Sequence, residues 1–347
     1  MVGRHIIQMT VAYVILAAIY GCQNDNVFDA KVYHSKAWHT YSVEGEKVSM
    51  KDAGLVGISG IHVCGSAILL KTSHSSQHSQ IHILSLPGLF DMGHYLTRGR
   101  GTNELLSPII KSHAKDSGGD DLVYIFDLNL CSSYCLNLSE SVRKQSTALT
   151  HLINLPSGTV DAYPYGEKHV VIVPESNDYV CSIIDESGQQ VNRMSLYPDL
   201  PGIWYFDTLS SANAVDRDKE KLVMAMCMIP QVNILNLDTG EKKTAAVAED
   251  YRDWRKILDK DARQRIYYTG ITQSSEYVMA LYCDARFEDW VKEQYMPHIH
   301  IFDWDGNFLY DITLDKKLKA IAYDESGDCM YGIDINDEIY RYVFQGI

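Results

Sequence analysis

Apolar and polar positions alternate regularly at the C-terminal end of the chain, from His298 to Phe344. Five short runs occur there, HIHIF, FLYDITL, LKAIAY, CMYGIDI and EIYRYVF, and polar segments such as DWDGN, DESGD and IND separate them. Asp and Asn tolerate the left-handed backbone conformation, and Gly adopts positive φ without a steric penalty, so each of these separators suits a tight turn. The pattern predicts a meander of strands of about five to seven residues.

Similar units recur upstream of this segment. Two strands joined by a turn with Asp and Gly occur at Tyr179–Leu196, Gln231–Val247 and His298–Leu314, and a looser copy, Gln80–Leu96, turns at Pro87-Gly88. Two further strands precede each of these units. The repeat is therefore a four-stranded antiparallel blade that recurs every 45 to 65 residues or so, which is typical of a β-propeller.

The repeats predict an all-β fold, one six-bladed propeller domain over residues 31–347. The predicted blades are Gly54–Leu96, Leu105–Leu155, Gly158–Tyr197, Leu209–Val247, Arg265–Leu314 and Leu318–Phe344. The second blade has to draw its first strand from LLSPIIKSH, and the sixth contains only three strands. We expect the N-terminal segment Lys31–Met50 to supply the missing outer strand, because closing the ring removes the open edges of the sheets.

The first 22 residues have the pattern of an export signal. Arg4 precedes the apolar run Val11–Tyr20, which is too short to span a membrane. The run leads into Ile19-Tyr20-Gly21-Cys22, which resembles the bacterial lipoprotein signal. That resemblance implies a lipid on Cys22, loss of residues 1–21, a tether over residues 22–30, and membrane contact through the lipid alone. An ordinary cleaved signal and a misassigned chain start are the alternatives.

Two phrases of the chain resemble a known family. The C-terminal meander and the glycine-rich segment TRGRGTNELLSP (Thr97–Pro108) are similar to phrases of the TolB-like six-bladed propeller lipoproteins of Bacteroidetes. The resemblance covers nearly the whole mature chain and is weakest from Lys111 to Ser157; Thr102-Asn103 stands where the family often has Pro-Gly. It implies a propeller held in the bacterial envelope, in the periplasm or at the outer-membrane surface. It implies no catalytic residues, because most members have no assigned function.

The composition bears on which partners the protein can bind and on whether it contains disulfide bridges. The 347 residues include 45 acidic and 31 basic side chains, a net charge of -14, without a block rich in Lys or Arg. This argues against nucleic acid and against an anionic membrane surface as partners. Of the eight cysteines, only Cys131 and Cys135 are close neighbours, so no disulfide framework is predicted, although a bridge between these two remains open.

The lengths of the predicted loops distinguish the two faces of the propeller. Tight turns fall on one face, whereas the long connections Ser73–Gln80, Thr97–Glu104, Tyr197–Phe206, Ala248–Ala262 and Asp284–Pro297 all fall on the other, which we call the elaborated face. The last two connections have the apolar spacing of short helices. Binding residues concentrate on loops held by a rigid scaffold. The candidate binding residues are therefore Trp204, Tyr205, Trp254, Trp290, Arg100 and Glu104.

Each of these candidates has a structural alternative. The two predicted helices would pack their aromatic faces onto the blades as a lid. Arg100 and Glu104 would lie near the mouth of the central channel, either as ligand contacts or as a brace between blades.

No motif predicts catalysis, a metal or a cofactor. Asp303, Asp305 and Asn307 resemble the start of a calcium loop but lack the Gly and Glu spacing of an EF-hand, so they are interpreted as a turn. His298 and His300 share one face of a strand and are interpreted as packing or surface residues. The sequence contains no G-x-S-x-G, and no Ser-His-Asp set can be assembled from it.

The leading hypothesis is a non-catalytic envelope lipoprotein that binds a protein, peptide or carbohydrate on its elaborated face. A propeller hydrolase or lactonase with a metal ion at the central channel is the rival. That chemistry requires inner-strand carboxylates such as Asp161, Asp216 and Asp324 to converge on one ion. A scaffolding role in a larger envelope complex is the third possibility, since fold alone does not settle function.

Overall fold

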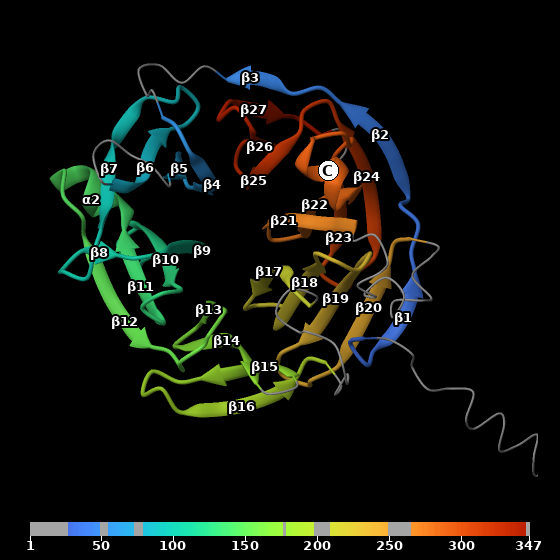
Figure 1. Cartoon of the computed structure of the whole chain (residues 1–347). Helices are drawn as coiled ribbons and strands as arrows, with labels where there is room; N and C mark the ends of the chain where they lie inside the picture. The colour runs from blue at the N-terminus through green and yellow to red at the C-terminus, as the bar shows by residue number, and fades with distance from the viewer. Residues whose placement is uncertain are drawn as a thin grey trace, which may run out of the picture.

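Six mostly antiparallel sheets stand around a common axis, each with its first strand innermost (Figure 1). The computed structural model describes residues 27–48, 55–72, 79–175, 178–197, 209–248 and 265–344. The chain is a six-bladed β-propeller, as the repeats predict. Within the described ranges, no helix combines the length and the apolar character needed to cross a membrane.

The blades follow one another along the chain. Blade I contains β4 (Ile58–Cys64), β5 (Ala67–Thr72), β6 (Ser79–Ser85), β7 (Asp91–Arg98) and β8 (Glu104–Leu105); blade II contains β9 (Pro108–Lys115), β10 (Asp121–Asp127), β11 (Ser132–Asn137) and β12 (Leu149–Asn154), with helix α2 (Leu138–Lys144) before β12. Blade III contains β13 (Asp161–Tyr165), β14 (Lys168–Glu175), β15 (Asp178–Ile184) and β16 (Gln190–Ser195).

The remaining blades are built in the same way. Blade IV contains β17 (Ser211–Asp216), β18 (Lys221–Met226), β19 (Gln231–Asn236) and β20 (Lys242–Ala246); blade V contains β21 (Arg265–Gln273), β22 (Tyr277–Arg286), β23 (His298–Asp303) and β24 (Phe308–Leu314), with helix α5 (Phe287–Val291) after β22. Blade VI contains β25 (Leu318–Asp324), β26 (Cys329–Asp334) and β27 (Ile339–Tyr342). Most of the predicted blade limits are confirmed, including the origin of the first strand of blade II. Blade I extends further than predicted, because β7 ends at Arg98 and β8 includes Leu105. Helix α2 lies in the connection between the third and fourth strands of blade II, on the face for which only tight turns were predicted, so that prediction is wrong for blade II.

The N-terminal segment closes the ring and continues past two further blades. Its strand β3 (Glu46–Val48) pairs antiparallel with β27, which confirms the predicted closure of blade VI. Before that, β1 (Lys31–His34) pairs parallel with β20, and β2 (His39–Val43) pairs parallel with β24. Figure 1 shows this blue segment along the outside of blades IV, V and VI. The two parallel strands were not predicted, because no turn motif joins them to their partners.

Asp side chains organise the predicted tight turns. Asp303 Oδ1 accepts hydrogen bonds from the backbone N–H groups of Asp305 (2.9 Å) and Asn307 (2.8 Å), and Gly306 supplies a φ of 78°. The turn interpretation of this segment is confirmed. Asp185 binds the N–H groups of Ser187 and Gln189 in the same way. The motif therefore encodes blade turns and leaves its carboxylates occupied by the backbone.

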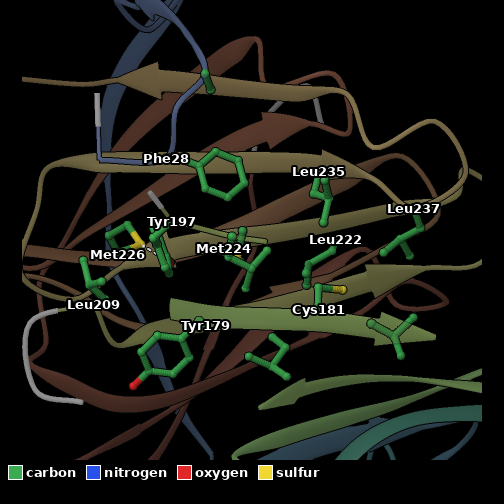
Figure 2. Close-up of a cluster of buried hydrophobic side chains, with 14 of the residues drawn as sticks. Phe28, Tyr179, Cys181, Tyr197, Leu209, Leu222, Met224, Met226, Leu235 and Leu237 are labelled. Carbon is green, nitrogen blue, oxygen red and sulfur yellow. Dashed lines mark hydrogen bonds between the residues drawn. The ribbon is translucent and has the colours of Figure 1, made fainter. Parts of the chain in front are cut away.

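The segment before β1 is anchored in the core between blades III and IV. Val27 and Phe28 are fully buried and Ala30 is 2% exposed, in the cluster drawn in Figure 2. The Phe28 ring meets Tyr197 edge to face, with 5.9 Å between ring centroids, and Lys242 Nζ lies 4.8 Å from its centroid. The tether predicted for residues 22–30 therefore has to end before Val27. Its first part, residues 22–26, lies outside the described residues.

All seven cysteines in the described part of the chain are free thiols, including Cys131 and Cys135. Cys64, Cys181 and Cys283 are buried in strands, where a thiol behaves as a small apolar side chain.

We expect Phe28→Ala to lower the free energy of unfolding by about 3–5 kcal/mol, because it removes a fully buried ring from the joint between two blades. Urea denaturation followed by circular dichroism measures the effect. Phe90→Ala is the matched control, since Phe90 is 58% exposed, and it should change stability by no more than about 0.5 kcal/mol. Equal effects of the two variants would contradict the anchoring role of Phe28.

Candidate functional site

The first strands of all six blades enclose a central channel with a volume of about 470 Å³. Each first strand begins at the elaborated face, because the connections between blades lie there. Asp161 and Ser211, the first residues of β13 and β17, therefore lie at the end of the channel nearer this face. Ser275 and Glu325 follow the ends of β21 and β25 and lie at the opposite end.

A charged pair and two polar side chains link blades II, III and IV near the elaborated face. Lys111 Nζ contacts Asp161 Oδ1, and both side chains are only 11% exposed. Asp161 Oδ2 accepts hydrogen bonds from the Tyr163 hydroxyl (2.7 Å) and from Asn213 Nδ2 (3.0 Å). Burial and the Asp161 charge raise the pKa of Tyr163 well above its ordinary value, so its hydroxyl stays protonated and can donate. The carboxylate of Asp161 is thus bound by its neighbours.

A side pocket of about 170 Å³ adjoins the channel at this end. Asp161, Ser211 and Asn213 line both spaces, and the side pocket is otherwise mostly apolar, with Tyr179 and Met224 among its lining residues. The Ser211 hydroxyl lies 2.7 Å from Asn213 Oδ1, to which it donates a hydrogen bond. The mouth of the channel therefore combines a polar wall with an apolar recess.

Two histidines from blades I and II meet toward the other end of the channel. His62 Nε2 and His113 Nδ1 are 3.1 Å apart, within hydrogen-bond distance. Burial and the neighbouring His113 lower the pKa of His62 to about 3. Burial also lowers the pKa of His113, against the opposing effect of Asp121 and Glu325. The pair is therefore uncharged at neutral pH.

The charged residues lining the channel are mostly acidic. Lys111 faces the channel together with Asp161, Asp216 and Glu325, and the two histidines add no charge at neutral pH. Ser112, Ser211, Asn213, Thr272 and Gln273 supply hydroxyl and amide groups, which can both donate and accept hydrogen bonds. This lining disfavours an anionic ligand and suits an uncharged polar one.

The predicted pair Arg100 and Glu104 lies away from the channel. The segment after β7 turns back so that β8 pairs with β7 as the outermost strand of blade I. Glu104 Oε2 accepts a hydrogen bond from the Gly101 N–H (2.7 Å), and a Cβ on Gly99 would lie 1.9 Å from the same oxygen. Arg100 is exposed. The proposed location at the channel mouth is wrong, because the loop closes on its own backbone at the blade edge.

One of the four predicted aromatic residues lies in the described part of the chain. Trp290 is half-buried on α5, which packs against β22 and β21, and its ring centroid is 6.1 Å from that of Phe287. Phe287, Val291 and Met296 are 49%, 58% and 55% exposed. The short helix predicted within Asp284–Pro297 is confirmed, and it covers the blade only in part. Trp204, Tyr205, Trp254, the helix predicted within Ala248–Ala262 and the lipid-attachment residue Cys22 lie outside the described residues.

The carboxylates considered for an axial metal do not share one point. Asp161 is bound to Lys111, Tyr163 and Asn213 as described above. Asp216 Oδ1 accepts from the Lys219 N–H (2.8 Å), and Asp324 Oδ1 accepts from Ser326 and Gly327 in the turn after β25. Asp216 and Asp324 are thus held within their own blades, and Asp161 is already engaged by Lys111 and Asn213 of the two neighbouring blades, so the geometry does not favour a metal at the channel.

Lys111, Tyr163 and Asn213 were missed as site residues. Each lies on the first strand of a blade, and alternate residues of such a strand face the axis. That periodicity could have identified them as residues lining the channel. It could not have shown which side chains meet, because the meeting pairs come from different blades.

Comparison with known proteins finds relatives by fold only. No family model matches the chain, and no curated protein matches it. A Bacteroides fragilis protein named as a "putative exported protein" is similar in structure, with a TM-score of 0.53, 11% identity, and coverage of 90% of this chain and 99% of that one. A DUF4221 family member from Bacteroides vulgatus is similar in structure with a TM-score of 0.53 and 9% identity. The match covers 88% of this chain and 98% of that one. These similarities support the propeller fold; the TolB-like resemblance stays a prediction.

We expect Lys111→Met to lower the free energy of unfolding by about 3–5 kcal/mol, because it leaves the buried Asp161 carboxylate without its cation. The double variant Lys111→Met/Asp161→Asn should cost clearly less than the sum of the two single changes. Urea denaturation of all four proteins gives this coupling. Lys144→Met, which removes an exposed ion pair with Glu140 on α2, is the control and should cost no more than about 0.5 kcal/mol. If the double variant loses as much free energy of unfolding as the two single variants together, Lys111 and Asp161 are not coupled.

Proposed function

We propose that the protein is an exported, lipid-anchored binding module that holds a small, uncharged, hydroxyl-rich ligand, such as a mono- or disaccharide, in its central channel. The observation that carries this proposal is the channel itself. Its volume of about 470 Å³ lies within the range of small-molecule sites, and polar groups from several blades converge in it.

The chemistry of the lining supports this class of ligand. Lys111 carries three N–H donors, and its contact with Asp161 uses one of them. Ser112, Thr272 and Gln273 add groups that can pair with ligand hydroxyls. Because the hydroxyl and amide groups both donate and accept, they match a sugar hydroxyl, which does the same. The acidic side chains make an anionic sugar a poor fit.

Observations outside the channel support export and lipid anchoring. The apolar run before Cys22 has the pattern of a lipoprotein signal. The Bacteroides fragilis protein with the similar fold is named as exported. A propeller tethered by a lipid and a short segment would be held close to a membrane surface.

The ligand proposal predicts that neutral sugars stabilise the protein. We expect one or more of glucose, galactose, xylose and maltose to raise Tm, and glucose 6-phosphate to have no effect. A ligand at 100 times its Kd adds about 2.7 kcal/mol to stability. Ser211→Trp, which places a large ring at the channel mouth, should abolish the shift. Gln189→Trp is the control, because Gln189 is exposed on the face with the tight turns. If no sugar shifts Tm, or if Ser211→Trp responds like the unaltered protein, the proposal is wrong.

The anchoring proposal predicts that Cys22→Ser abolishes lipid attachment. In cells fed a labelled fatty acid, the unaltered protein should carry label and sediment with membranes. The Cys22→Ser variant should carry none and should remain unprocessed or appear in the soluble fraction. Cys131→Ser, which alters an unrelated free thiol, should behave like the unaltered protein. Label retained in the Cys22→Ser variant would contradict lipidation at this residue.

A further inference from the structure

A second polar cluster lies in blade V, outside the channel. It contains His298 and His300 of β23 and Asp311 of β24. One potential ligand atom from each side chain lies within 4.8 Å of the other two. Among the described residues, this is the one group of three or more His, Cys, Asp or Glu side chains with such a geometry.

The strand register brings the three side chains together. His298 and His300 are two residues apart on β23 and therefore share a face of the blade. Asp311 is paired with His300 across the ladder, so its side chain lies on that same face. His298 Nδ1 lies 2.7 Å from Asp311 Oδ1, and His300 Nε2 lies 3.7 Å from the same oxygen. Both imidazoles thus point at one carboxylate.

His300 is held rigidly by aromatic neighbours. It is 3% exposed, and the Tyr282 ring stacks on it with 4.0 Å between centroids. The Tyr268 hydroxyl lies 3.0 Å from His300 Nδ1, so the opposite nitrogen, Nε2, is the one directed at Asp311. Ligating histidines normally bind a fixed partner through their second ring nitrogen, and Tyr268 supplies that partner.

The cluster is open to solvent on one side. The side chains of His298 and Asp311 are 29% and 28% exposed. His298 also lines a pocket of about 390 Å³ beside α5, where Arg265, Asp284 and Asp289 bring charged groups to the rim. Arg265 is bound to Asp284 at 2.6 Å. An ion could enter from this pocket and keep a water molecule as a further ligand.

We propose that His298, His300 and Asp311 form a binding site for one zinc-type divalent cation. Two imidazole nitrogens and one carboxylate, with a remaining position open to solvent, form a ligand set that zinc accepts. A hydrogen bond between His298 and Asp311 explains their contact without a metal. His300 Nε2 faces the same carboxylate from 3.7 Å, which is beyond hydrogen-bond distance, so a cation held between them would join His300 to the pair.

The sequence pattern indicates packing or surface roles for these histidines, since most such pairs on one face of a strand have those roles. It does not include Asp311, which only the strand register places beside His300. In the structure, His300 is packed and is also a candidate ligand. The two roles are compatible, since the packing fixes the orientation that a metal would need.

The test is isothermal titration of untagged, metal-free protein with Zn²⁺, with chelator competition if binding is tight. We expect one equivalent to bind in the unaltered protein, and His298→Ala and Asp311→Asn to lose that binding. Tyr268→Phe keeps the ring and removes the hydroxyl, so it should weaken zinc binding by about 10–100-fold. Substitution by Co²⁺ should give visible absorption bands that Asp311→Asn abolishes.

Two controls separate a metal site from general effects. His151→Ala removes an exposed histidine of blade II and should bind zinc like the unaltered protein. The Tm of each metal-free variant shows whether it is folded, and the partly exposed positions 298 and 311 are chosen for that reason. Zinc binding that is absent from the unaltered protein, or unchanged in Asp311→Asn, would overturn the proposal. Sugar binding in the channel should be unaffected by Asp311→Asn, so the two proposals can fail independently.

Discussion

Closure of the ring is the constraint on which the rest of this structure depends. Blade VI has three strands of its own, and β3 supplies the fourth from the other end of the chain. Without that pairing, β27 would present an open edge, and the first and last blades would be free to separate. The same segment buries Phe28 between blades III and IV and adds β1 and β2 to blades IV and V. Closure is thus distributed over half of the ring.

A closed ring brings the inner strands close enough for polar side chains to meet across blade boundaries. Lys111 reaches Asp161 from blade II to blade III, His62 meets His113 between blades I and II, and Ser275 binds Glu325 between blades V and VI. Burying a charged pair costs desolvation that its attraction only partly offsets, so the Lys111–Asp161 contact is better understood as setting the arrangement of the blades than as a net source of stability. The channel that remains is polar because these groups line it.

The two proposed sites use the blades in different ways. The channel is assembled from single strands of several blades and has groups suited to many weak hydrogen bonds. The blade V cluster is built within one sheet, where strand register and aromatic packing hold three side chains around one point. The pocket beside α5 lies at His298, on the face where β22 ends and β23 begins. The Asp161 end of the channel and the pocket at His298 therefore lie toward the same face.

The sequence by itself determined the local structure, because turns and strand alternation depend on neighbouring residues. Most of the blade limits, the Asp303–Asn307 turn and the closing strand could be predicted in this way. Only the tertiary structure decided which side chains meet. Arg100 and Glu104 lie at a blade edge, Lys111 pairs with Asp161, and Asp311 faces His300. These outcomes depend on register and on packing between blades, which are set by contacts distant in the chain.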